Sequence, residues 1–389
     1  MIKTLIAYTT EIDDPECASS EILEQLSLKS GLLENSVGII TCYIDFINTG
    51  TVKEICARLP FDVVGINTMY SATSGESGEL MLVLTVLTSD DVSFAAALSA
   101  PLKNGGKEAR KKELADLYRR AASALPDKPK LMLTFPPFIS DMSGDEFVRH
   151  LDAASGGVPM FGSQPCDFTT SMRTPLVLFG GEPHADRAAI ILMCGNIRPT
   201  FSSTRITDDK ILRREAIVTG SDGNILKEIN RVPALNYLES LGMADKGRID
   251  GKHLLIPLVI DYNDGVGPLM RVITSQTIEG HVLLSGTIPV NSTLEFGALD
   301  ARYVVDSAEN MISSAMNQGY DCVFIVSCII RNFILGFDNM AEIEIIQSRM
   351  AGVTPFLLTC SGGEICPAPM KDGKLINRFH NVTACLCAF

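Results

Sequence analysis

The first half of the chain alternates short apolar runs with amphipathic segments of helix length. Residues 4–10, 36–44 and 61–68 are apolar runs of strand length, and 17–28 and 51–59 between them carry apolar residues at helical spacing. Strands separated by amphipathic helices are typical of βαβ units with a mostly parallel sheet. The pattern therefore predicts an α/β fold for this half, with mixed sheets and flanking helices.

The pattern changes from about residue 175 onward, where strand-like runs follow one another with turns rather than helices between them. Residues 256–299 read as a β-meander, and a long helix over 301–319 leads into a final α/β unit. We therefore predict an α/β chain with α+β elements in two domains, 1–235 and 236–389. No repeat is visible at a fixed period.

Polar and reactive side chains gather where the apolar strands of the C-terminal tail, residues 321–389, end. A strand buried on both faces has no structural need for such groups at its exit, and α/β scaffolds present ligand pockets there. We therefore expect the second domain to carry a ligand pocket. Its candidate residues are Cys328, Arg331, Ser361, Glu364, His380, Asn381 and Thr383.

Arg331 and Glu364 form a candidate pair for a zwitterionic ligand. The guanidinium can hold a ligand carboxylate through two parallel hydrogen bonds, while Glu364 takes an amine, which is the arrangement that an amino acid requires. The alternatives are an ion pair between Arg331 and Glu364 that closes two strand ends, or a Glu364 that faces water in a turn. The sequence leaves these readings open.

His380 is harder to place. In a continuous strand over 374–389, His380 lies on one face and Asn381 and Thr383 on the other, so all three line one pocket only if a bulge breaks the alternation. His380 is then either a ligand contact or a structural histidine with its bonds satisfied. An axial haem ligand is a further alternative, which requires a large apolar pocket.

Charge and hydropathy exclude several classes of partner. The formal net charge is -13, which argues against nucleic acid and anionic membranes, because phosphate binding needs a basic surface. Lys and Arg cluster once, over 105–120, and acidic residues interleaved there predict a solvated helix face. No run approaches the roughly 18 apolar residues of a membrane span. We therefore expect a cytoplasmic protein without membrane insertion.

The cysteines and the missing catalytic motifs argue against an enzyme. Eleven cysteines, mostly within apolar runs and without a CxxC pair, indicate reduced buried thiols rather than disulfides or a metal site. The chain has no GxSxG elbow and no phosphate-binding loop. A nucleophilic Cys328 or Cys360 paired with His380 remains an alternative. Otherwise we expect no catalytic residues and no cofactor.

The order of these segments resembles the FIST sensory module, with both its N-terminal and C-terminal halves present. The N-terminal half is matched by DVVGINT, LTVLTSDDVSF, GGVPMFGSQPCDF and the PALNYLESLG helix. The C-terminal half is matched by PLMRVITSQTIEGHVLLSGTIPVNSTLEF, by VSCIIR, and by CSGGEICP followed by HNVT. The resemblance covers essentially the whole chain, and the final set is its most specific part.

The resemblance implies a cytoplasmic signal-input protein of bacterial type that binds a small molecule such as an amino acid. Its implied partners are a histidine kinase, a chemoreceptor or a cyclic-dinucleotide enzyme. Some members resemble haem-binding nitric-oxide sensors, so a haem gas sensor is the alternative and a cysteine-dependent enzyme the third reading. No output domain follows Phe389, so we expect the signal to leave by contact with a separate protein.

Overall fold

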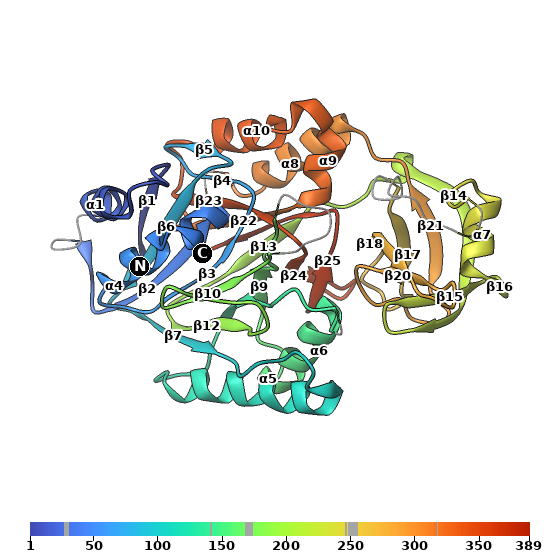
Figure 1. Cartoon of the computed structure of the whole chain (residues 1–389), viewed down its shortest axis with the longest axis horizontal. Coiled ribbons are helices and arrows are strands. Elements are labelled where there is room, and N and C mark those ends of the chain that lie inside the picture. The colour runs from blue at the N-terminus through green and yellow to red at the C-terminus, as the bar shows by residue number, and fades with distance from the viewer. Residues whose placement is uncertain (27–30, 141, 168–173, 246, 248–255, 317) are drawn as a thin grey trace.

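In the part of the chain that the structure describes, three six-stranded sheets, each covered by helices, form the body of the molecule, and an eight-stranded curled sheet stands beside it (Figure 1). The computed structural model describes residues 1–389 except 27–30, 141, 168–173, 246, 248–255 and 317, with the main chain only at 213–214. The mixed α/β fold predicted from the sequence is confirmed. None of the described helices is long and apolar enough to cross a membrane.

The N-terminal unit of the body supplies four strands to the first sheet and the helices on its outer face. The strands are β1 (Lys3–Thr9), β2 (Asn35–Cys42), β3 (Val63–Asn67) and β6 (Leu82–Ser89), and the helices are α1 (Pro15–Leu26), α3 (Ile44–Asn48) and α4 (Thr51–Ala57). Between β3 and β6 a short hairpin leaves the unit. It consists of β4 (Ser71–Ala72) and β5 (Ser77–Gly78).

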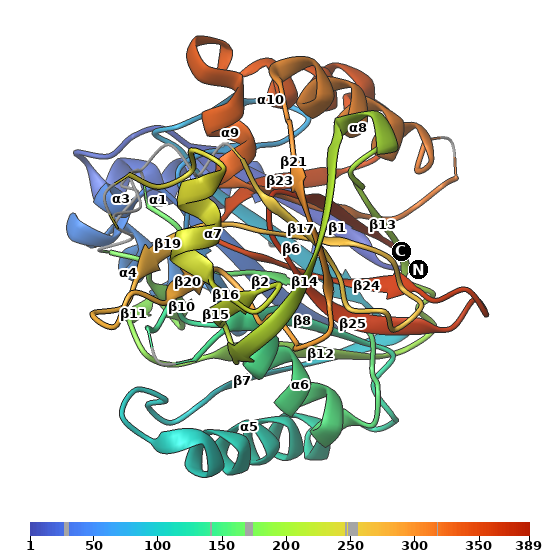
Figure 2. The ribbon, with the colours of Figure 1, turned by 90° about the vertical axis from the view of Figure 1, so that its right-hand side faces the viewer.

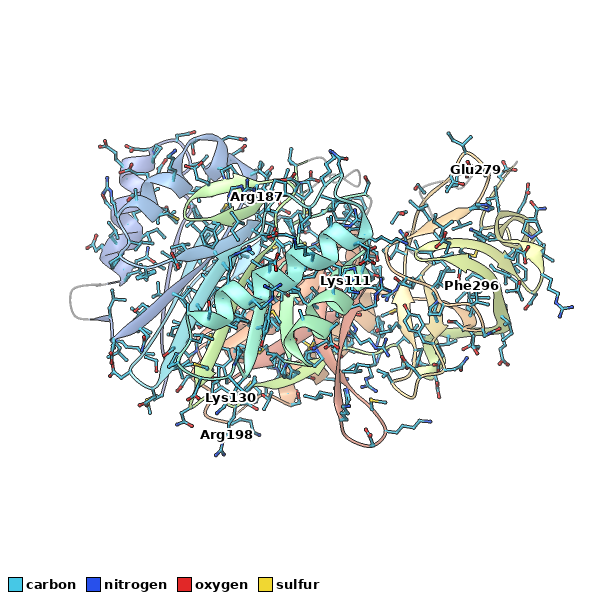
Figure 3. All side chains as sticks on the ribbon, turned by 90° about the horizontal axis from the view of Figure 1, so that it is seen from below. Lys111, Lys130, Arg187, Arg198, Glu279 and Phe296 are labelled. Atoms are coloured by element: carbon cyan, nitrogen blue, oxygen red, sulfur yellow. The ribbon has the colours of Figure 1, made fainter. Side chains whose placement is uncertain are left out.

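The second unit repeats this arrangement in the second sheet. Its strands are β7 (Val92–Leu98), β8 (Leu131–Phe135), β9 (Met160–Ser163) and β12 (Ala189–Gly195), and its helices are α5 (Gly106–Ser123) and α6 (Gly144–Ser155). Its hairpin consists of β10 (Val177–Phe179) and β11 (Glu182–His184). Helix α5 packs Leu114 and Leu117 inward and exposes lysines such as Lys111 on the underside of the body (Figure 3). The predicted solvated helix face is confirmed.

The third unit builds the third sheet. Its strands are β13 (Thr200–Ser203), β22 (Val323–Cys328), β23 (Phe356–Ser361) and β26 (Ala384–Ala388), and its helices are α8 (Ala301–Ser313), α9 (Ile329–Leu335) and α10 (Ala341–Met350). Its hairpin consists of β24 (Glu364–Pro369) and β25 (Leu375–His380). Seen from the barrel side, the two chain termini lie together (Figure 2), and the Asp321 segment hydrogen-bonds to both Ile2 and Phe389.

The three sheets share one topology. Their strand orders are β1-β6-β2-β3-β10-β11, β7-β12-β8-β9-β24-β25 and β13-β26-β22-β23-β4-β5. In each unit the second and third strands in chain order are parallel to each other. A hairpin from another unit completes the edge of each sheet. The units therefore exchange hairpins in a cycle. No repeat at a fixed period is visible in the sequence, because the third unit carries a long insertion between β13 and β22.

The inner faces of the three sheets enclose one apolar core on the axis that relates them. Each unit contributes the same strand positions to it, as the equivalent side chains Ile39, Leu133 and Phe324 show. Only about 40 Å³ remains open among them. Close parallel pairing needs glycine beside this core, because a Cβ on Gly65 or Gly162 would lie within 2 Å of a carbonyl oxygen of the neighbouring strand.

The insertion in the third unit folds into a barrel-like sheet with its own apolar core. The sheet runs β18-β17-β21-β14-β15-β20-β19, and only Val272 separates β18 from β19, so it curls back on itself. The proposed boundary at 235/236 falls within its helix. The elements are β14 (Ile211–Asp222), β15 (Ile225–Ile229), β16 (Val232–Pro233), α7 (Ala234–Ser240), β17 (Leu258–Asp261), β18 (Leu269–Arg271), β19 (Ile273–Gln276), β20 (Val282–Leu284) and β21 (Thr293–Gly297).

Of the two possibilities that the sequence leaves open for 374–389, a continuous strand and a strand with a break, the structure shows the break. The segment is divided into β25, in the second sheet, and β26, in the third. Between them the buried Val382 adopts a φ of 59°, a left-handed conformation that is rare for a β-branched residue. Because of this break, the regular alternation of side chains between the two faces of a strand does not continue from Asn381 to Thr383.

Candidate functional site

A cavity of about 350 Å³ lies between the barrel and the body. Its body side is formed by the segment that leads into α6, by the start of α9 and by the loops that follow β9 and β23, and its other side by the barrel. The lining residues are Phe138, Ile139, Ser140, Met142, Ser143, Gly144, Gln164, Asn224, Val272, Thr274, Leu283, Leu284, Ser285, Cys328, Ile329, Ile330, Phe333, Gly362 and Asn381.

The walls of this cavity are apolar with a few neutral polar groups. Amide and hydroxyl side chains such as Gln164, Ser285 and Asn381 interrupt a lining of aliphatic and aromatic groups. Among the residues that the structure describes, none with a carboxyl, amino, imidazole or guanidinium side chain lines it. Such walls favour a ligand that brings little net charge into the protein, because an unpaired buried charge is costly.

The cavity lies where parallel strands of the body end. In open α/β sheets ligands bind outside the carboxyl ends of the strands, and here the loops after β9 and β23 are held together by main-chain hydrogen bonds. Gly362 N–H donates to the Gln164 carbonyl at 3.0 Å, and Gln164 N–H donates to the Gly363 carbonyl at 2.9 Å. The sequence prediction that strand ends form a pocket is in agreement with this placement.

Two of the seven predicted residues, Cys328 and Asn381, line the cavity. Ser361, Glu364 and Thr383 are buried close to Cys328, and Glu364 accepts a hydrogen bond from Thr383 N–H at 3.4 Å. Burial raises the pKa of the Glu364 carboxyl well above its usual range, although its hydrogen bonds with Cys328 and Ser361 act to lower that pKa. Glu364 is therefore a neutral, buried group and not a turn residue that faces water.

The cysteines predicted as possible nucleophiles are held as thiols. Burial raises the pKa of Cys328 and that of Cys360 well above the usual value, and the neighbouring Glu364 adds to the effect at Cys328. Nucleophilic attack and metal ligation both need the thiolate. The environment of these two side chains therefore opposes a cysteine-dependent reaction.

Arg331 lies on α9, away from the cavity, and is paired with Glu342. Its Nε and Nη2 donate to Glu342 Oε1 at 2.9 and 2.6 Å, and Nη2 also donates to the carbonyl of Val304. Both side chains are almost completely buried. The expected ion pair with Glu364 is wrong, because Glu342 is the partner. Ser327 donates to the second Glu342 oxygen at 2.7 Å, so the pair is fully engaged within the protein.

His380 also turns away from the cavity. Its Nε2 lies 3.0 Å from the carbonyl oxygen of Cys366, and burial lowers its pKa to about 4. Haem iron is held by histidine, by a cysteine thiolate, by tyrosine or by methionine together with histidine, and among the described lining residues Met142 has no histidine or tyrosine beside it. No histidine of the described chain lines it, and Cys328 is a thiol, so these residues do not fit a haem. The described residues also contain no group of three His, Cys, Asp or Glu side chains arranged to hold a metal ion.

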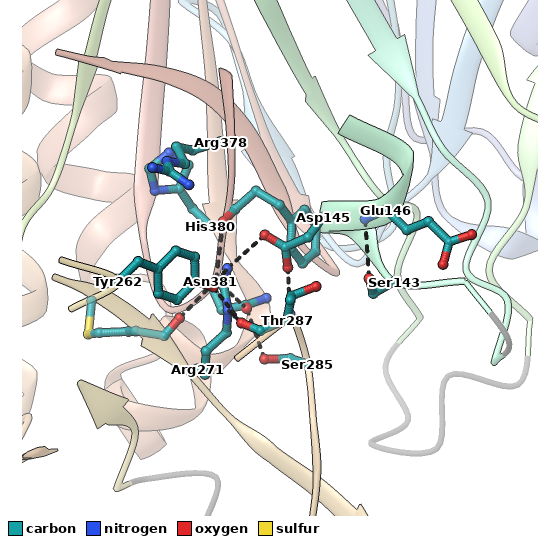
Figure 4. A network of polar contacts seen from close by, with 12 residues as sticks. Ser143, Asp145, Glu146, Tyr262, Arg271, Ser285, Thr287, Arg378, His380 and Asn381 are labelled. Carbon is teal, nitrogen blue, oxygen red and sulfur yellow. Dashed lines mark hydrogen bonds and ion pairs between the residues drawn. The ribbon is translucent and has the colours of Figure 1, made fainter. Parts of the chain in front are cut away.

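Sequence reasoning missed Arg271, the buried residue that joins the barrel to the body (Figure 4). This arginine ends β18 and is 0% exposed. Its Nη2 donates to Asp145 Oδ1 and to the Tyr262 hydroxyl, both at 2.9 Å. Its Nη1 donates to the carbonyl of Phe379 at 3.1 Å and to Asn381 Oδ1 at 3.2 Å. One side chain thus connects the barrel to α6 and to the end of β25.

The surrounding segments complete this Arg271 network. Asp145 Oδ2 accepts from the Thr287 N–H of the barrel at 2.7 Å, and Ser285 donates to Asn381 Oδ1 at 2.8 Å. A Cβ on Gly286 would lie 2.5 Å from both the Arg271 guanidinium and the Asp145 carboxylate, so glycine is required there. The only signal in the sequence was a lone arginine within the apolar strand PLMRVI. Asn381 belongs to the network and to the cavity wall at once.

The chain belongs to the FIST family, whose members are sensory and signalling domains. The FIST N domain matches residues 36–231 and the FIST C domain matches residues 234–367. The family resemblance read from the sequence is confirmed, and the two matched regions meet at 232–233, close to the proposed domain boundary.

Solved structures show a distant likeness, and none of the curated proteins matches the chain. A cyanuric acid hydrolase from A. caulinodans is 8% identical with a TM-score of 0.41, over 100% of this chain and 99% of that one. Another, described as an evolutionary innovation by structural concatenation, is 8% identical with a TM-score of 0.37, over 100% of this chain and 98% of that one. Similarities of this size carry no statement about chemistry.

Proposed function

We propose that this FIST protein is a signal-input protein whose small-molecule ligand occupies the cavity between the barrel and the body. The observation that carries this proposal is the shared wall, since the body and the inserted barrel each supply part of one lining. A ligand there contacts both parts at once. It therefore favours whichever arrangement of the barrel gives the better contacts.

The Arg271 network supports a route from the ligand to the barrel. Asn381 lines the cavity and accepts hydrogen bonds from Arg271 and Ser285, both of which belong to the barrel. A ligand that binds to Asn381 changes the surroundings of the same bonds that hold the barrel in place. The output is then a change in the barrel surface, read by a separate histidine kinase, chemoreceptor or cyclic-dinucleotide enzyme. A cytoplasmic location is part of the proposal, and the ten buried free cysteines support it.

The ligand that best suits this site is not the amino acid first expected. That expectation depended on Arg331 and Glu364, and neither lines the cavity. Arg331 is engaged by Glu342, and Glu364 is neutral behind the wall. A ligand with a largely apolar body fits these walls better than a zwitterion does.

The test fills the cavity and follows both the ligand and the barrel. Leu283 on β20 lines the cavity and is half-buried, so Leu283→Trp places a large ring in it. We expect native mass spectrometry of wild-type protein incubated with a small-molecule cell extract to show a bound species, and hydrogen exchange to slow in β18–β20 and α6. Leu283→Trp should lose both effects.

A matched control introduces the same side chain elsewhere. Leu375→Trp, at the exposed start of β25 and outside the cavity lining, should keep the bound species and the change in exchange. The proposal fails if Leu283→Trp, with an unchanged circular dichroism spectrum, retains the same ligand, or if ligand changes exchange nowhere in the barrel.

A further inference from the structure

We infer that the cavity selects an uncharged ligand that carries an amide or lactam group on an apolar body. This inference rests on the proposed function, because it names the chemistry of the ligand for that same site. It is carried by two buried side-chain amides in the cavity wall, Asn381 and Gln164, whose orientations are fixed by their partners.

Asn381 offers a hydrogen-bond donor. Its Oδ1 accepts from Arg271 Nη1 at 3.2 Å and from Ser285 Oγ at 2.8 Å. An arginine can only donate, so the oxygen of the Asn381 amide must face it and Nδ2 must point the other way. The side chain is 2% exposed, and its Nδ2 makes no hydrogen bond within the described part of the chain. This donor is therefore free to bind at the cavity wall, and a ligand carbonyl there would accept its hydrogen bond.

Gln164 offers the complementary acceptor. Its Nε2 donates to the carbonyl of Pro137 at 3.3 Å. A carbonyl can only accept, so this bond orients the Gln164 amide and leaves Oε1 without a hydrogen bond among the residues described here. Gln164 is 5% exposed and lines the same cavity. One donor and one acceptor in a single wall match a group that has both a C=O and an N–H.

The remaining walls exclude a charged ligand and favour an apolar body. The nearest guanidinium, that of Arg271, is already paired with Asp145, and Arg331 with Glu342. A ligand carboxylate or ammonium would thus enter without a free counter-charge and would lose its hydration. Side chains such as Ile330, Phe333 and Leu284 can instead cover an aromatic or aliphatic ligand body.

The test compares three probes that share an indole ring: indole-3-acetamide, indole-3-acetate and tryptamine. The protein contains no tryptophan, so the indole fluorescence of the probe reports binding directly. We expect the amide to bind at least tenfold more tightly than the carboxylate or the amine. Methyl indole-3-acetate keeps the carbonyl but lacks the N–H, and should bind at least fivefold more weakly than the amide.

Asn381→Asp replaces the Nδ2 donor with an acceptor oxygen and adds a negative charge next to Arg271. The aspartate keeps oxygens for Arg271 and Ser285, so the fold should be preserved, while the amide probe should lose at least tenfold in affinity. Ser140→Ala, at an exposed position of the cavity lining, is the matched control and should stay within twofold of wild type.

The inference is overturned if either charged probe binds as tightly as the amide, or if Asn381→Asp binds the amide like wild type. Absence of binding by the amide at millimolar concentration also overturns it. None of these results touches the proposed function, which depends on the ligand and the barrel response in the Leu283→Trp comparison.

Discussion

Three buried ionisable residues that do not line the cavity show how burial decides their chemistry. Burial raises the pKa of the Glu364 carboxyl well above its usual range, and the charge of Arg331 does not offset this effect. Arg331 keeps its charge because Glu342 accompanies it into the interior. His380 is neutral because burial lowers its pKa and the nearby Arg271 and Arg378 add to the effect. The sequence analysis named all three as candidate ligand-binding residues, but in the structure their contacts are with other parts of the protein.

His380 should make stability depend on pH. Its pKa is about 4 in the folded protein and about 6.5 in the unfolded chain, so on acidification the unfolded chain binds the proton first. The contribution is fully present above pH 6.5 and is lost as the pH falls toward 4, by roughly 3 kcal/mol. We expect urea unfolding to show this loss in wild type and not in His380→Gln, compared with each protein's stability at pH 8. Equal losses in the two proteins would contradict the assignment.

At the scale of elements, the barrel is joined to the body by the Arg271 network and by apolar packing, since Val259, Met270 and Val272 belong to a buried cluster that also contains side chains of the third unit. Strand β18, helix α6 and strand β25 meet at Arg271, and Gly144 and Gly286 allow the close approach of their segments. The barrel has its own apolar core, so its internal packing does not depend on this junction. Loss of the network should therefore loosen the barrel against the body without unfolding it, because the apolar packing on either side of the junction remains.

Arg271→Met should strongly destabilise the junction. Removal of one partner leaves the Asp145 carboxylate uncompensated, which costs about 3–5 kcal/mol for a buried pair. Double substitution with Asp145→Asn should cost less than the sum of the single changes. Hydrogen exchange should speed up in β18, α6 and β25 and stay slow in the core of the body.

Arg302→Met, which breaks an exposed pair with Asp306 on α8, is the control and should cost under about 1 kcal/mol. Similar losses for Arg271 and Arg302 would contradict this role.

At the scale of the whole molecule, the body is three similar units that complete one another's sheets. The hairpin β4–β5 covers the edge of β23, β10–β11 covers β3, and β24–β25 covers β9. Each unit alone would leave an open strand edge and an uncovered face of the central core. The three units are therefore held together by the exchanged hairpins as well as by the chain segments that connect them.

Separate fragments should consequently reassemble. Division of the chain after the exposed Arg198, between β12 and β13, leaves two hairpins to be exchanged across the cut. We expect fragments 1–198 and 199–389, co-expressed, to purify as a one-to-one complex and each alone to aggregate. Ala72→Pro in the first fragment, which disturbs the pairing of β4 with Leu358, should abolish the complex. Two fragments that each fold as a stable monomer and do not associate would refute the exchange.

The sequence by itself determined the α/β class, most of the elements and the FIST family. Strand and helix periods are local properties, so runs such as 36–44 and the charged helix over 105–120 could be predicted from their own residues. It also placed a pocket at the ends of the tail strands, and Cys328 and Asn381 were among its candidates. Polar groups at the end of an apolar strand can be recognised in the sequence without knowledge of the fold.

Only the tertiary structure decided which of these groups meet. Arg271 and Asp145 are 126 residues apart, and no local period connects them. Arg331 pairs with Glu342 on a following helix and not with Glu364 on a strand, because helix α9 begins directly after Cys328. The break at Val382 and the exchanged hairpins likewise depend on edges supplied by distant segments. Periodicity fixes which face of an element is buried, but the partner of a buried polar group is chosen by which elements pack against that face.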